Sequence, residues 1–402
     1  MHIERLLIEN FRNIVSLQEV PHPRFNVYEG DNGQGKTNLL EAIAVLSGLR
    51  SFRTSKLGEC IRFEQARAEV GGRVVGRGQR VDLGVAIEGN RARVQIDGRP
   101  PSRQSEALVV LATVVFSAAD LQLAHGEPAQ RRRWLDRAMF QHRPGYLAEL
   151  RRFESAIANR NALLRSALRN EAARPGAGVD LDALDAFDVV LAEVGGLIRA
   201  RRDGFLRGFV ADFGREFSAF GATGVEASLH YLVHEPSSAR SYRPATALVG
   251  AAGGSAAAET EQLVADLRAR RRLDLQRGVT SVGPQRDDIA VMLSGRPAAV
   301  HASAGQSRSL AIAWRIAEIA SLERALGEPP VLLLDDLSSE LDAERNAALM
   351  RHLDALGGQV FLTTTDARHI KLQADARRVR VQAGRLVASG LALGEDGGAS
   401  SR

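Results

Sequence analysis

Residues 27–41 read VYEGDNGQGKTNLLE and contain the spacing G-x-x-x-x-G-K-[ST], completed by Gly30, Gly35, Lys36 and Thr37. Glycines lack a Cβ, so their backbone N–H groups can turn inward around a phosphate. The lysine of this pattern reaches the β- and γ-phosphates, and the hydroxyl that follows it ligates Mg²⁺. The sequence therefore predicts that a nucleoside triphosphate is bound by the whole loop: Gly30, Asp31, Asn32, Gly33, Gln34, Gly35, Lys36 and Thr37.

The flanking residues give this loop the context it requires. The preceding FNVY favours a buried strand, and the following NLLEAIAVLS favours a helix whose N-terminus presents a positive dipole end to an anion. Lysine is rare here, because Lys36, Lys56 and Lys371 are the only lysines among 53 lysines and arginines. A compact ammonium fits a narrow phosphate loop better than a planar guanidinium does. The alternative, a glycine turn before an unrelated helix, is disfavoured by this strand–loop–helix context.

A second apolar run ends in two carboxylates. Residues 331–336 read VLLLDD, which fits a central strand of a parallel sheet with Asp335 and Asp336 at the ligand-facing end. Asp335 is predicted to hold Mg²⁺ opposite Thr37, directly or through water; a helix N-cap is its structural alternative. Asp336 is the candidate catalytic residue, orienting or deprotonating the attacking water. It is one methylene shorter than the glutamate usual in related ATPases.

Ser303, Gly305 and Gln306 open another apolar helical segment. Small residues at a helix start expose N–H groups to an anion, although a simple helix cap also explains this pattern. Because the segment precedes Asp335 with one helix between, it is similar to the signature segment of ABC-type ATPase heads. That segment contacts nucleotide held by a second protomer. The residues after Asp336, LSSELD, resemble the D-loop of the same class.

Bulk properties restrict the class of protein. The 402 residues suffice for two or three lobes, and a net charge of +5 permits an anionic partner without establishing one. Cys60 is the only cysteine, which excludes an intrachain disulfide and a cysteine-based zinc cluster. The N-terminus alternates apolar and polar residues, unlike a signal peptide, and no apolar run approaches a membrane span. We expect a soluble cytoplasmic protein with no membrane contact.

The α/β pattern occurs at both ends of the chain and is interrupted by helices. Strands are expected at 3–9, 25–29, 68–75, 81–88, 92–97, 107–116, 288–293, 331–335 and 359–364, and helices at 306–325 and 342–356, with a further helix starting near 128. Two helices with a heptad-like seam, separated by the linker 173–180, predict an antiparallel arm packed on itself, each helix roughly 40 Å long at 1.5 Å per residue. Residues 251–260 are expected to form a mobile loop.

Several motifs together identify a family. They are ENFRN (9–13), GDNGQGKTNLLEAI, SFR (51–53), VVFSAADL (114–121), PAQRRRWLD (128–136), GPQRDD (283–288), SAGQ and LLLDDLSSELD. In these segments, which extend over nearly the whole chain, it resembles the RecF family of recombinational-repair proteins, which are built like SMC heads. Three positions depart from the pattern: Gln285 replaces a frequent histidine, TTTD (363–366) lies where ABC ATPases often carry a switch histidine, and Ala302 replaces the leading leucine of the signature.

The resemblance implies an α/β fold, an ABC-type P-loop ATPase head with a mixed sheet and an inserted α-helical arm lobe. The expected domains are residues 1–122 for the N-terminal part of the head, 123–278 for the mainly helical arm, and 279–390 for the C-terminal part. Residues 391–402 are expected to be a disordered tail.

The resemblance also implies a function. ATP and Mg²⁺ would drive two heads together on duplex, gapped and single-stranded DNA, and slow, DNA-stimulated hydrolysis would release them. The expected partners are RecR and RecO, and indirectly the RecA recombinase, in repair, replication and the SOS response. Candidate DNA contacts are the arginines of two basic runs: Arg131, Arg132, Arg133, Arg268, Arg270, Arg271 and Arg272. The alternatives are an ABC transporter nucleotide-binding subunit and a clamp that binds ATP without turnover.

Overall fold

The computed structural model describes residues 1–173, 180–220, 224–235, 241–244, 252–337, 341–367, 370 and 372–388. These residues form two compact units. Unit 1 contains residues 1–102, 110–117 and the chain from 330 onward, and unit 2 contains residues 103–109 and 118–329. The stretch 279–329, which we expected in the C-terminal part of the ATPase head, thus clusters with the helical unit. The expected tail at 391–402 and the linker at 174–179 lie outside the described residues.

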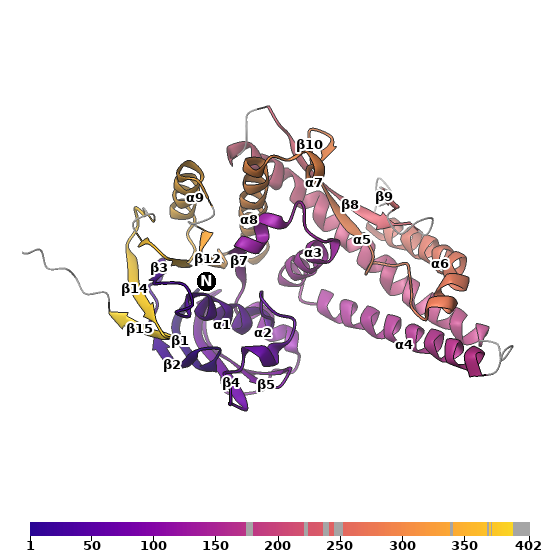
Figure 1. The fold of residues 1–402 in the computed structure, drawn as a ribbon, viewed down its shortest axis with the longest axis horizontal. Coiled ribbons are helices and arrows are strands. Elements are labelled where there is room, and N and C mark those ends of the chain that lie inside the picture. The colour runs from indigo at the N-terminus through magenta and orange to yellow at the C-terminus, as the bar shows by residue number, and fades with distance from the viewer. Residues whose placement is uncertain are drawn as a thin grey trace, which may run out of the picture. The chain divides into compact units, whose positions relative to one another are not determined.

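A six-stranded sheet forms one layer of unit 1, in the order β15-β14-β3-β13-β12-β7 (Figure 1). Its strands are β3 (Phe25–Glu29), β7 (Thr113–Ser117), β12 (Val331–Asp335), β13 (Val360–Thr364), β14 (Ala376–Gln382) and β15 (Arg385–Ala388). All but the β14–β15 pair are parallel. β12 is paired on both sides and its first four residues are buried, as the apolar run VLLL predicts. The carboxyl ends of five parallel strands therefore meet at one edge.

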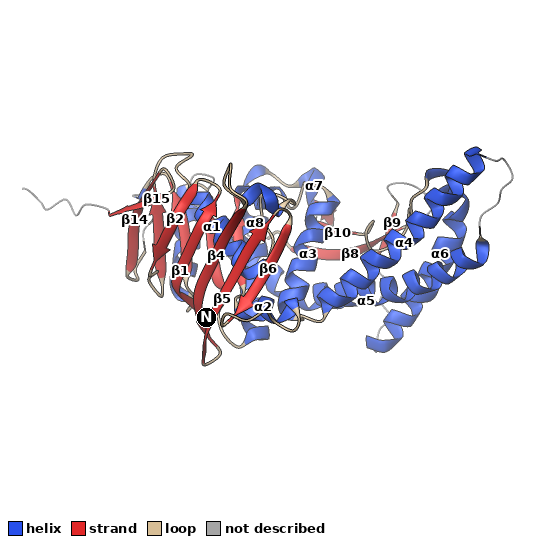
Figure 2. Ribbon diagram, turned by 90° about the horizontal axis from the view of Figure 1, so that it is seen from below, coloured by secondary structure: helices blue, strands red, loops and turns tan. Residues whose placement is uncertain are grey.

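A five-stranded antiparallel sheet forms the second layer of unit 1, in the order β2-β1-β4-β5-β6 (Figure 2). Its strands are β1 (His2–Phe11), β2 (Ile14–Glu19), β4 (Arg67–Gly76), β5 (Gln79–Glu88) and β6 (Arg91–Ile96). Helix α1 (Lys36–Gly48) contacts strands of both sheets and is buried around most of its circumference. Such a helix needs apolar residues on every face, which LLEAIAVL supplies. Among its described residues, this unit also contains the 3₁₀ helix η1 (Leu57–Cys60) and α9 (Ala343–Ala355).

A side-chain amide joins the two sheets. Gln359 is buried directly before β13, where its Oε1 accepts a 2.7 Å hydrogen bond from the Ile3 backbone N–H. Its Nε2 donates to the Ile3 carbonyl at 3.0 Å. Gln359 thus satisfies both backbone groups of one β1 residue, as a neighbouring strand would.

Unit 2 is mainly helical. Its helices are α2 (Gln104–Val110), η2 (Ala118–Gln122), α3 (Pro128–His142), α4 (Tyr146–Ala173), α5 (Leu181–Phe220), α6 (Ala252–Arg277), α7 (Ala298–His301) and α8 (Ala304–Leu326). The ion pairs of Arg152 with Glu193 and of Arg201 with Glu149 show that α4 and α5 run antiparallel, as the seam predicts. α5 packs against α6 as well, so the described part of the arm contains three helices where we expected two. At 40 residues, α5 spans roughly 60 Å, longer than expected.

A small sheet and an aromatic cluster complete unit 2. The sheet has the order β11-β10-β8-β9, formed by β8 (Ala227–His234), β9 (Tyr242–Pro244), β10 (Asp288–Leu293) and β11 (Arg296–Pro297). Trp134 on α3 meets Trp314 on α8 edge to face, with ring centroids 4.7 Å apart. Phe209 and Phe213 of α5 stack beside them. The aromatic rings therefore tie three helices together.

Two expectations from the sequence are wrong. The run 107–116 is not one strand, because α2 continues to Val110 and β7 begins only at Thr113. Residues 252–260 are not a loop, since α6 already begins at Ala252. Alanine has the highest helix propensity, so an alanine-rich stretch can continue a helix despite its two glycines. Among the described residues, no helix is both long enough and apolar enough to cross a bilayer.

Candidate functional site: the phosphate loop and its carboxylates

The loop between β3 and α1 has a backbone that only glycine fits at two positions. Gly30 has φ +154°, and a Cβ there would lie 2.5 Å from the carbonyl oxygen of Val381 on β14. Gly35 has φ +108°, and its Cβ would lie 2.7 Å from Oδ1 of Asn13. A side chain at either position would have to displace backbone or a hydrogen-bonded amide. The glycines of the sequence pattern are therefore required by the local geometry.

Hydrogen bonds from neighbouring turns hold the loop in place. The Asn13 amide donates to the Gln34 carbonyl at 3.2 Å and accepts from Asn38 Nδ2 at 2.8 Å. From the β14–β15 turn, the Gly384 N–H donates to the Gln34 carbonyl and the Ala383 N–H donates to Gln34 Oε1, both at 2.8 Å. The ENFRN segment thus contributes Asn13 as a support of the loop, so its phosphate-facing backbone is pre-organised.

Lys36, the first residue of α1, is only 6% exposed. Its Nζ donates to the carbonyl oxygens of Gly30 at 2.6 Å and Asp31 at 2.9 Å. Burial lowers the pKa of the Lys36 ammonium, and the carboxylates of Asp336, Asp335 and Asp31 partly oppose that shift. A buried ammonium surrounded by carbonyls and carboxylates is arranged to bind an anion that enters the loop.

Asp335 lies at the carboxyl end of β12 and accepts two hydroxyl hydrogen bonds on one oxygen. Thr37 Oγ1 donates to Asp335 Oδ1 at 2.8 Å, and Thr363 Oγ1 donates to the same oxygen at 2.9 Å. The parallel register aligns Asp335 with Thr363 on β13 and Ser117 on β7. The structure therefore brings together the hydroxyl and the carboxylate that the sequence assigned to one Mg²⁺ site. Such oxygen donors are the type that Mg²⁺ prefers.

Asp336 follows in a left-handed backbone conformation, with φ +49°. Its N–H donates to Thr363 Oγ1 at 3.0 Å. Thr363 is fully buried and thus connects both carboxylate residues. It is the first residue of the TTTD segment, where the sequence comparison with ABC ATPases places a switch histidine. A neutral hydroxyl at this place positions the two aspartates without a titratable group of its own.

Behind the loop, the fully buried Glu41 of α1 connects two family motifs. Arg12 donates to both of its oxygens, at 3.0 and 2.8 Å, and Arg53 and Ser51 donate to them at 3.0 and 2.5 Å. Burial raises the pKa of the Glu41 carboxyl, but the hydrogen bonds from Arg12 and Ser51 outweigh it, so the net pKa is lowered. The sequence motifs ENFRN and SFR point to this position, although spacing alone does not reveal their shared partner.

Ser303, Gly305 and Gln306 lie at the N-terminus of α8 in unit 2. Ser303 Oγ accepts from the Gln306 N–H at 3.2 Å, and Gln306 Oε1 accepts from the Ser303 N–H at 2.9 Å. These two hydrogen bonds form a capping box, so the side chains of Ser303 and Gln306 cap the helix in this structure. His125 approaches from a preceding loop, with Nε2 2.6 Å from Ser307 Oγ, and that hydroxyl donates to the Ser303 carbonyl. The exposed Ser303 therefore sits on a firmly held helix end.

The structure separates the arginines that were expected to contact DNA. Arg131 is only 7% exposed, and its guanidinium binds both oxygens of Asp288 at 2.8 and 2.9 Å. Arg271 pairs with Asp185 and Asp188. Both guanidinium groups are therefore paired with carboxylates, and contact of these two arginines with DNA stays a prediction. Three of the other candidate arginines are exposed to solvent: Arg133, Arg268 and Arg272.

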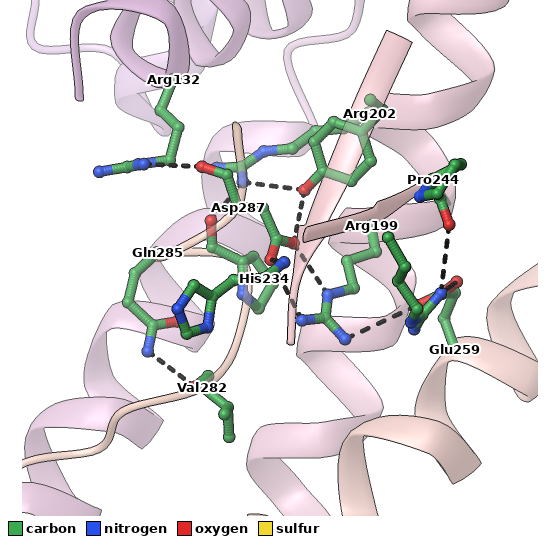
Figure 3. A network of polar contacts seen from close by, with 12 residues as sticks. Arg132, Arg199, Arg202, His234, Pro244, Glu259, Val282, Gln285 and Asp287 are labelled. Carbon is green, nitrogen blue, oxygen red and sulfur yellow. Dashed lines mark hydrogen bonds and ion pairs between the residues drawn. The ribbon is translucent and has the colours of Figure 1, made fainter. Parts of the chain in front are cut away.

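The GPQRDD motif organises a buried network in unit 2 (Figure 3). Asp287 is fully buried and accepts hydrogen bonds from Arg199 at 2.8 and 3.2 Å, the Tyr231 hydroxyl at 2.8 Å and the His234 N–H at 3.0 Å. Its carbonyl accepts from Arg132 at 2.6 Å. Gln285, which replaces a frequent histidine, donates to the Val282 carbonyl at 2.8 Å. This part of the motif is structural.

The phosphate loop, Asp335 and Asp336 all belong to unit 1, whereas the signature segment belongs to unit 2. Of the D-loop segment LSSELD, residues 338–340 lie outside the described residues. Sequence reasoning did not assign Thr363, Glu41 or Gln34 to these contacts. The alignment of strand ends in a parallel sheet was the signal that could have found Thr363, since Thr363 follows the apolar residues of β13 and is in register with Asp335.

Comparison with known proteins shows which family this chain resembles. The family model "RecF/RecN/SMC N terminal domain" matches residues 2–386. The DNA replication and repair protein RecF of Myxococcus xanthus is 39% identical over 375 residues, covering 92% of each chain. The RecF protein of Geobacter sulfurreducens is 38% identical over 378 residues, covering 93% of this chain and 95% of that protein.

Solved structures agree with these relatives. The recombination mediator RecF in complex with ATP, from the RecFOR pathway, superposes with a TM-score of 0.81 at 28% identity, covering 96% of this chain and 98% of that one. The Smc head domain derived from Pyrococcus furiosus has a TM-score of 0.51 at 15% identity, covering 96% of each chain, which indicates a shared fold alone. The fold is thus that of an ABC-type ATPase head, with α and β elements in mixed sheets.

Proposed function

This chain belongs to the RecF family, and from that premise we propose that it is an ATP-binding protein of DNA repair and replication that closes on DNA as an ATP-dependent homodimer. The observation that carries the proposal is the 2.8 Å hydrogen bond between Thr37 and Asp335, set beside a buried Lys36 on a glycine loop. Together these residues supply the phosphate cradle, the cation and the oxygen ligands that triphosphate binding requires.

Thr37 and Asp335 would hold Mg²⁺, which neutralises negative charge on the β- and γ-phosphates when bound. The two threonine hydroxyls that converge on Asp335 Oδ1 fix this carboxylate at the strand end. Lys36 would exchange its carbonyl partners for phosphate oxygens. Gly30 and Gly35 leave open the space where a Cβ would otherwise approach within 2.5–2.7 Å of neighbouring atoms.

The signature segment supports a composite site. Ser303 is exposed at the start of a 23-residue helix, whose N-terminus favours negative charge. We propose that Ser303, Gly305 and Gln306 of one copy meet the triphosphate bound by Lys36 of a second copy. Two-fold symmetry then creates two such sites per dimer. ATP acts in this scheme as the group that joins the copies.

Asp336 is the proposed catalytic residue for slow hydrolysis, which would time release from DNA. Its neighbour Thr363 orients it through the backbone N–H. In an ATP single-turnover experiment, Asp336→Asn should hydrolyse at least about 100-fold more slowly than wild type while binding ATP normally, the usual size of a lost general base. Equal rates would remove Asp336 from catalysis and favour a clamp that binds ATP without turnover.

DNA at gaps and single-strand/duplex junctions is the proposed partner, with exposed Arg133, Arg268 and Arg272 among the candidate phosphate contacts. We further propose work with RecO and RecR, loading of the RecA recombinase, support of the SOS response and a cytoplasmic location. These finer assignments rest on membership of the family.

A complementation experiment tests the composite site. Lys36→Met removes the phosphate lysine, and Ser303→Arg blocks the signature. Each variant alone should show no ATPase stimulated by gapped DNA, but a mixture assembles one intact site per mixed dimer. We therefore expect the mixture to regain activity. A mixture as inactive as its components would contradict the proposed arrangement, and Lys36→Arg serves as a control that retains charge but not shape.

A further inference from the structure

Two motifs that the phosphate site does not use, PAQRRRWLD and GPQRDD, meet at a cavity within unit 2. The cavity has a volume of about 350 Å³, which far exceeds that of a single water. It lies between the first turn of α3, the ends of β8 and β9, the C-terminal part of α6 and the loop before β10. Its lining includes Arg132, Arg270, Arg277, Arg286, His234, Tyr242, Ser281 and Glu127. We call it the arginine pocket.

Charge is the distinguishing property of this pocket. Four guanidinium groups line it, against the single carboxylate of Glu127, which is the exposed N-cap of α3. Within the described part of the chain, none of the four arginines forms an ion pair. Their immediate neighbours do: Arg131 pairs with Asp288, and Arg271 with Asp185 and Asp188. The fold thus neutralises one arginine of each run and leaves the adjacent one facing the cavity.

The pocket is built rather than accidental. Asp287 holds one lining residue in place, because its carbonyl accepts a 2.6 Å hydrogen bond from Arg132 while Arg199 and Tyr231 bind its carboxylate (Figure 3). Burial and the neighbouring Arg202 cation lower the pKa of Arg132. A positive group held in that environment gains from a bound anion. Ser281 Oγ is buried and has no hydrogen-bond partner among the described residues, so it is available as a donor.

The remaining lining residues fit a nucleotide chain. Tyr242 and His234 meet edge to face with centroids 5.6 Å apart, and burial raises the pKa of the Tyr242 phenol, which therefore stays neutral. Guanidinium forks match phosphate oxygens, and aromatic rings contact sugars and bases. A phosphodiester carries one negative charge, so four arginines on three elements exceed what one phosphate needs. They suit successive phosphates along a strand.

We propose that the arginine pocket binds the phosphate backbone of a nucleic-acid strand. This contact differs from the one expected from the sequence, in which all the arginines of the two basic runs 131–133 and 268–272 would contact DNA. The inference deepens the proposed DNA-binding function and rests on it. It assigns Arg277 and Arg286, which lie outside both runs, and it includes only Arg132 and Arg270 from within them.

The test compares two double variants of the full chain with the same loss of charge. Arg277→Gln/Arg286→Gln removes two pocket cations. Arg165→Gln/Arg169→Gln removes two exposed arginines of α4 that form no ion pair within the described residues. Binding to fluorescent gapped duplex is measured by anisotropy with ATP at several salt concentrations. The pocket variant should bind about tenfold more weakly and lower the magnitude of the log–log salt slope by about 2. The control should bind within about twofold of wild type.

Further measurements distinguish failure of the arginine-pocket inference from failure of the proposed DNA-binding function. Arg277→Lys/Arg286→Lys keeps the charges and should recover most of the salt slope, which excludes misfolding as the cause of a loss. Equal affinities for the pocket variant and the α4 control would overturn the inference alone, provided that wild type binds DNA. Wild type that binds no DNA in any condition would overturn the proposed function as well. Calorimetry with inorganic pyrophosphate at saturating ATP tests whether the pocket binds a small phosphate anion instead of a nucleic-acid strand. Pyrophosphate binding that depends on the pocket, with unchanged DNA affinity, would also overturn the inference.

Discussion

The Thr37 hydroxyl and Oδ1 of Asp335 are joined by a 2.8 Å hydrogen bond, although 298 positions separate the two residues in the chain. This contact connects the start of α1 to the end of β12 and unites two motifs that sequence spacing alone does not relate. It defines the place where a hydroxyl and a carboxylate can share one divalent cation.

Removing either member of this pair should weaken Mg²⁺-dependent ATP binding. We expect Thr37→Ala and Asp335→Asn to raise the Kd for ATP with Mg²⁺ by at least about tenfold, corresponding to the roughly 1.4 kcal/mol or more that a lost charge-assisted contact costs. Thr37→Ser keeps the hydroxyl and should stay within about threefold of wild type. Calorimetric titration with and without Mg²⁺ measures these values. Unchanged affinity of Asp335→Asn in the presence of Mg²⁺ would remove it from the metal site.

The Glu41 cluster predicts a pH dependence of stability. Although burial raises the pKa of Glu41, hydrogen bonds from Arg12 and Ser51 bring it below its ordinary value of 4.5 in the folded state. The stabilisation is therefore present above pH 4.5 and is lost as the pH falls through the lowered folded-state pKa. Glu41→Gln should lower the free energy of unfolding by about 1–3 kcal/mol at pH 7.

Denaturant unfolding of wild type and Glu41→Gln between pH 4 and 8 measures this effect. The difference between the two proteins should be constant above pH 5.5 and narrow below pH 4.5. A difference that does not change over the whole range would show that the Glu41 charge is not responsible. Glu69→Gln on β4 is a matched control with an exposed carboxylate and should change stability little.

Cys60 should be unreactive in the native protein. It is fully buried beside Glu41, and burial, reinforced by the Glu41 charge, raises the pKa of the thiol to about 12. Because the thiolate is the nucleophile, alkylation by iodoacetamide at pH 8 should be at least about 100-fold slower than in denaturant. Mass spectrometry after timed quenching measures both rates. Similar rates in both conditions would show that this part of unit 1 opens readily.

Arg131 and Arg133 should differ in what they do, although both were expected to contact DNA. Arg131 is buried against Asp288, and breaking such a pair leaves a buried charge. Arg131→Ala should therefore lower the free energy of unfolding by about 3–5 kcal/mol. Arg133→Ala, at an exposed position, should change it by less than about 0.5 kcal/mol. Thermal unfolding distinguishes them, and equal stability of the two variants would contradict the assigned role of Arg131.

The parts of the fold that could be predicted are those where a local pattern determines the structure. β3 and β12 have the predicted bounds because apolar runs end in the chemistry-bearing residues Glu29–Gly30 and Asp335. The run ALVVLATVVF was ambiguous, because a short apolar run suits a buried helix as well as a strand. Its first half became α2. The alanine-rich residues 252–260 form the start of α6, because the helix propensity of alanine outweighs the low complexity that predicted a loop.

Contacts between distant segments could not be predicted in the same way. Nothing in the run Arg131–Arg133 tells which side chain meets Asp288 and which faces a cavity, because that depends on the rotation of α3 against β10. Likewise, Thr363 and Glu41 acquire their roles only when strands and motifs far apart in the chain become neighbours. The sequence identified the phosphate loop and both aspartates, while the fold supplied the groups that orient them.

The most direct test of the central claim is sedimentation velocity of Ser303→Arg with and without ATP. If the phosphate loop is completed by the signature of a second copy, Ser303→Arg binds ATP with wild-type affinity yet remains monomeric at ATP concentrations that dimerise wild type. Ser303→Ala, which removes the hydroxyl without adding bulk, should dimerise at higher ATP concentration. Dimers of Ser303→Arg at the same ATP concentration as wild type would contradict the account.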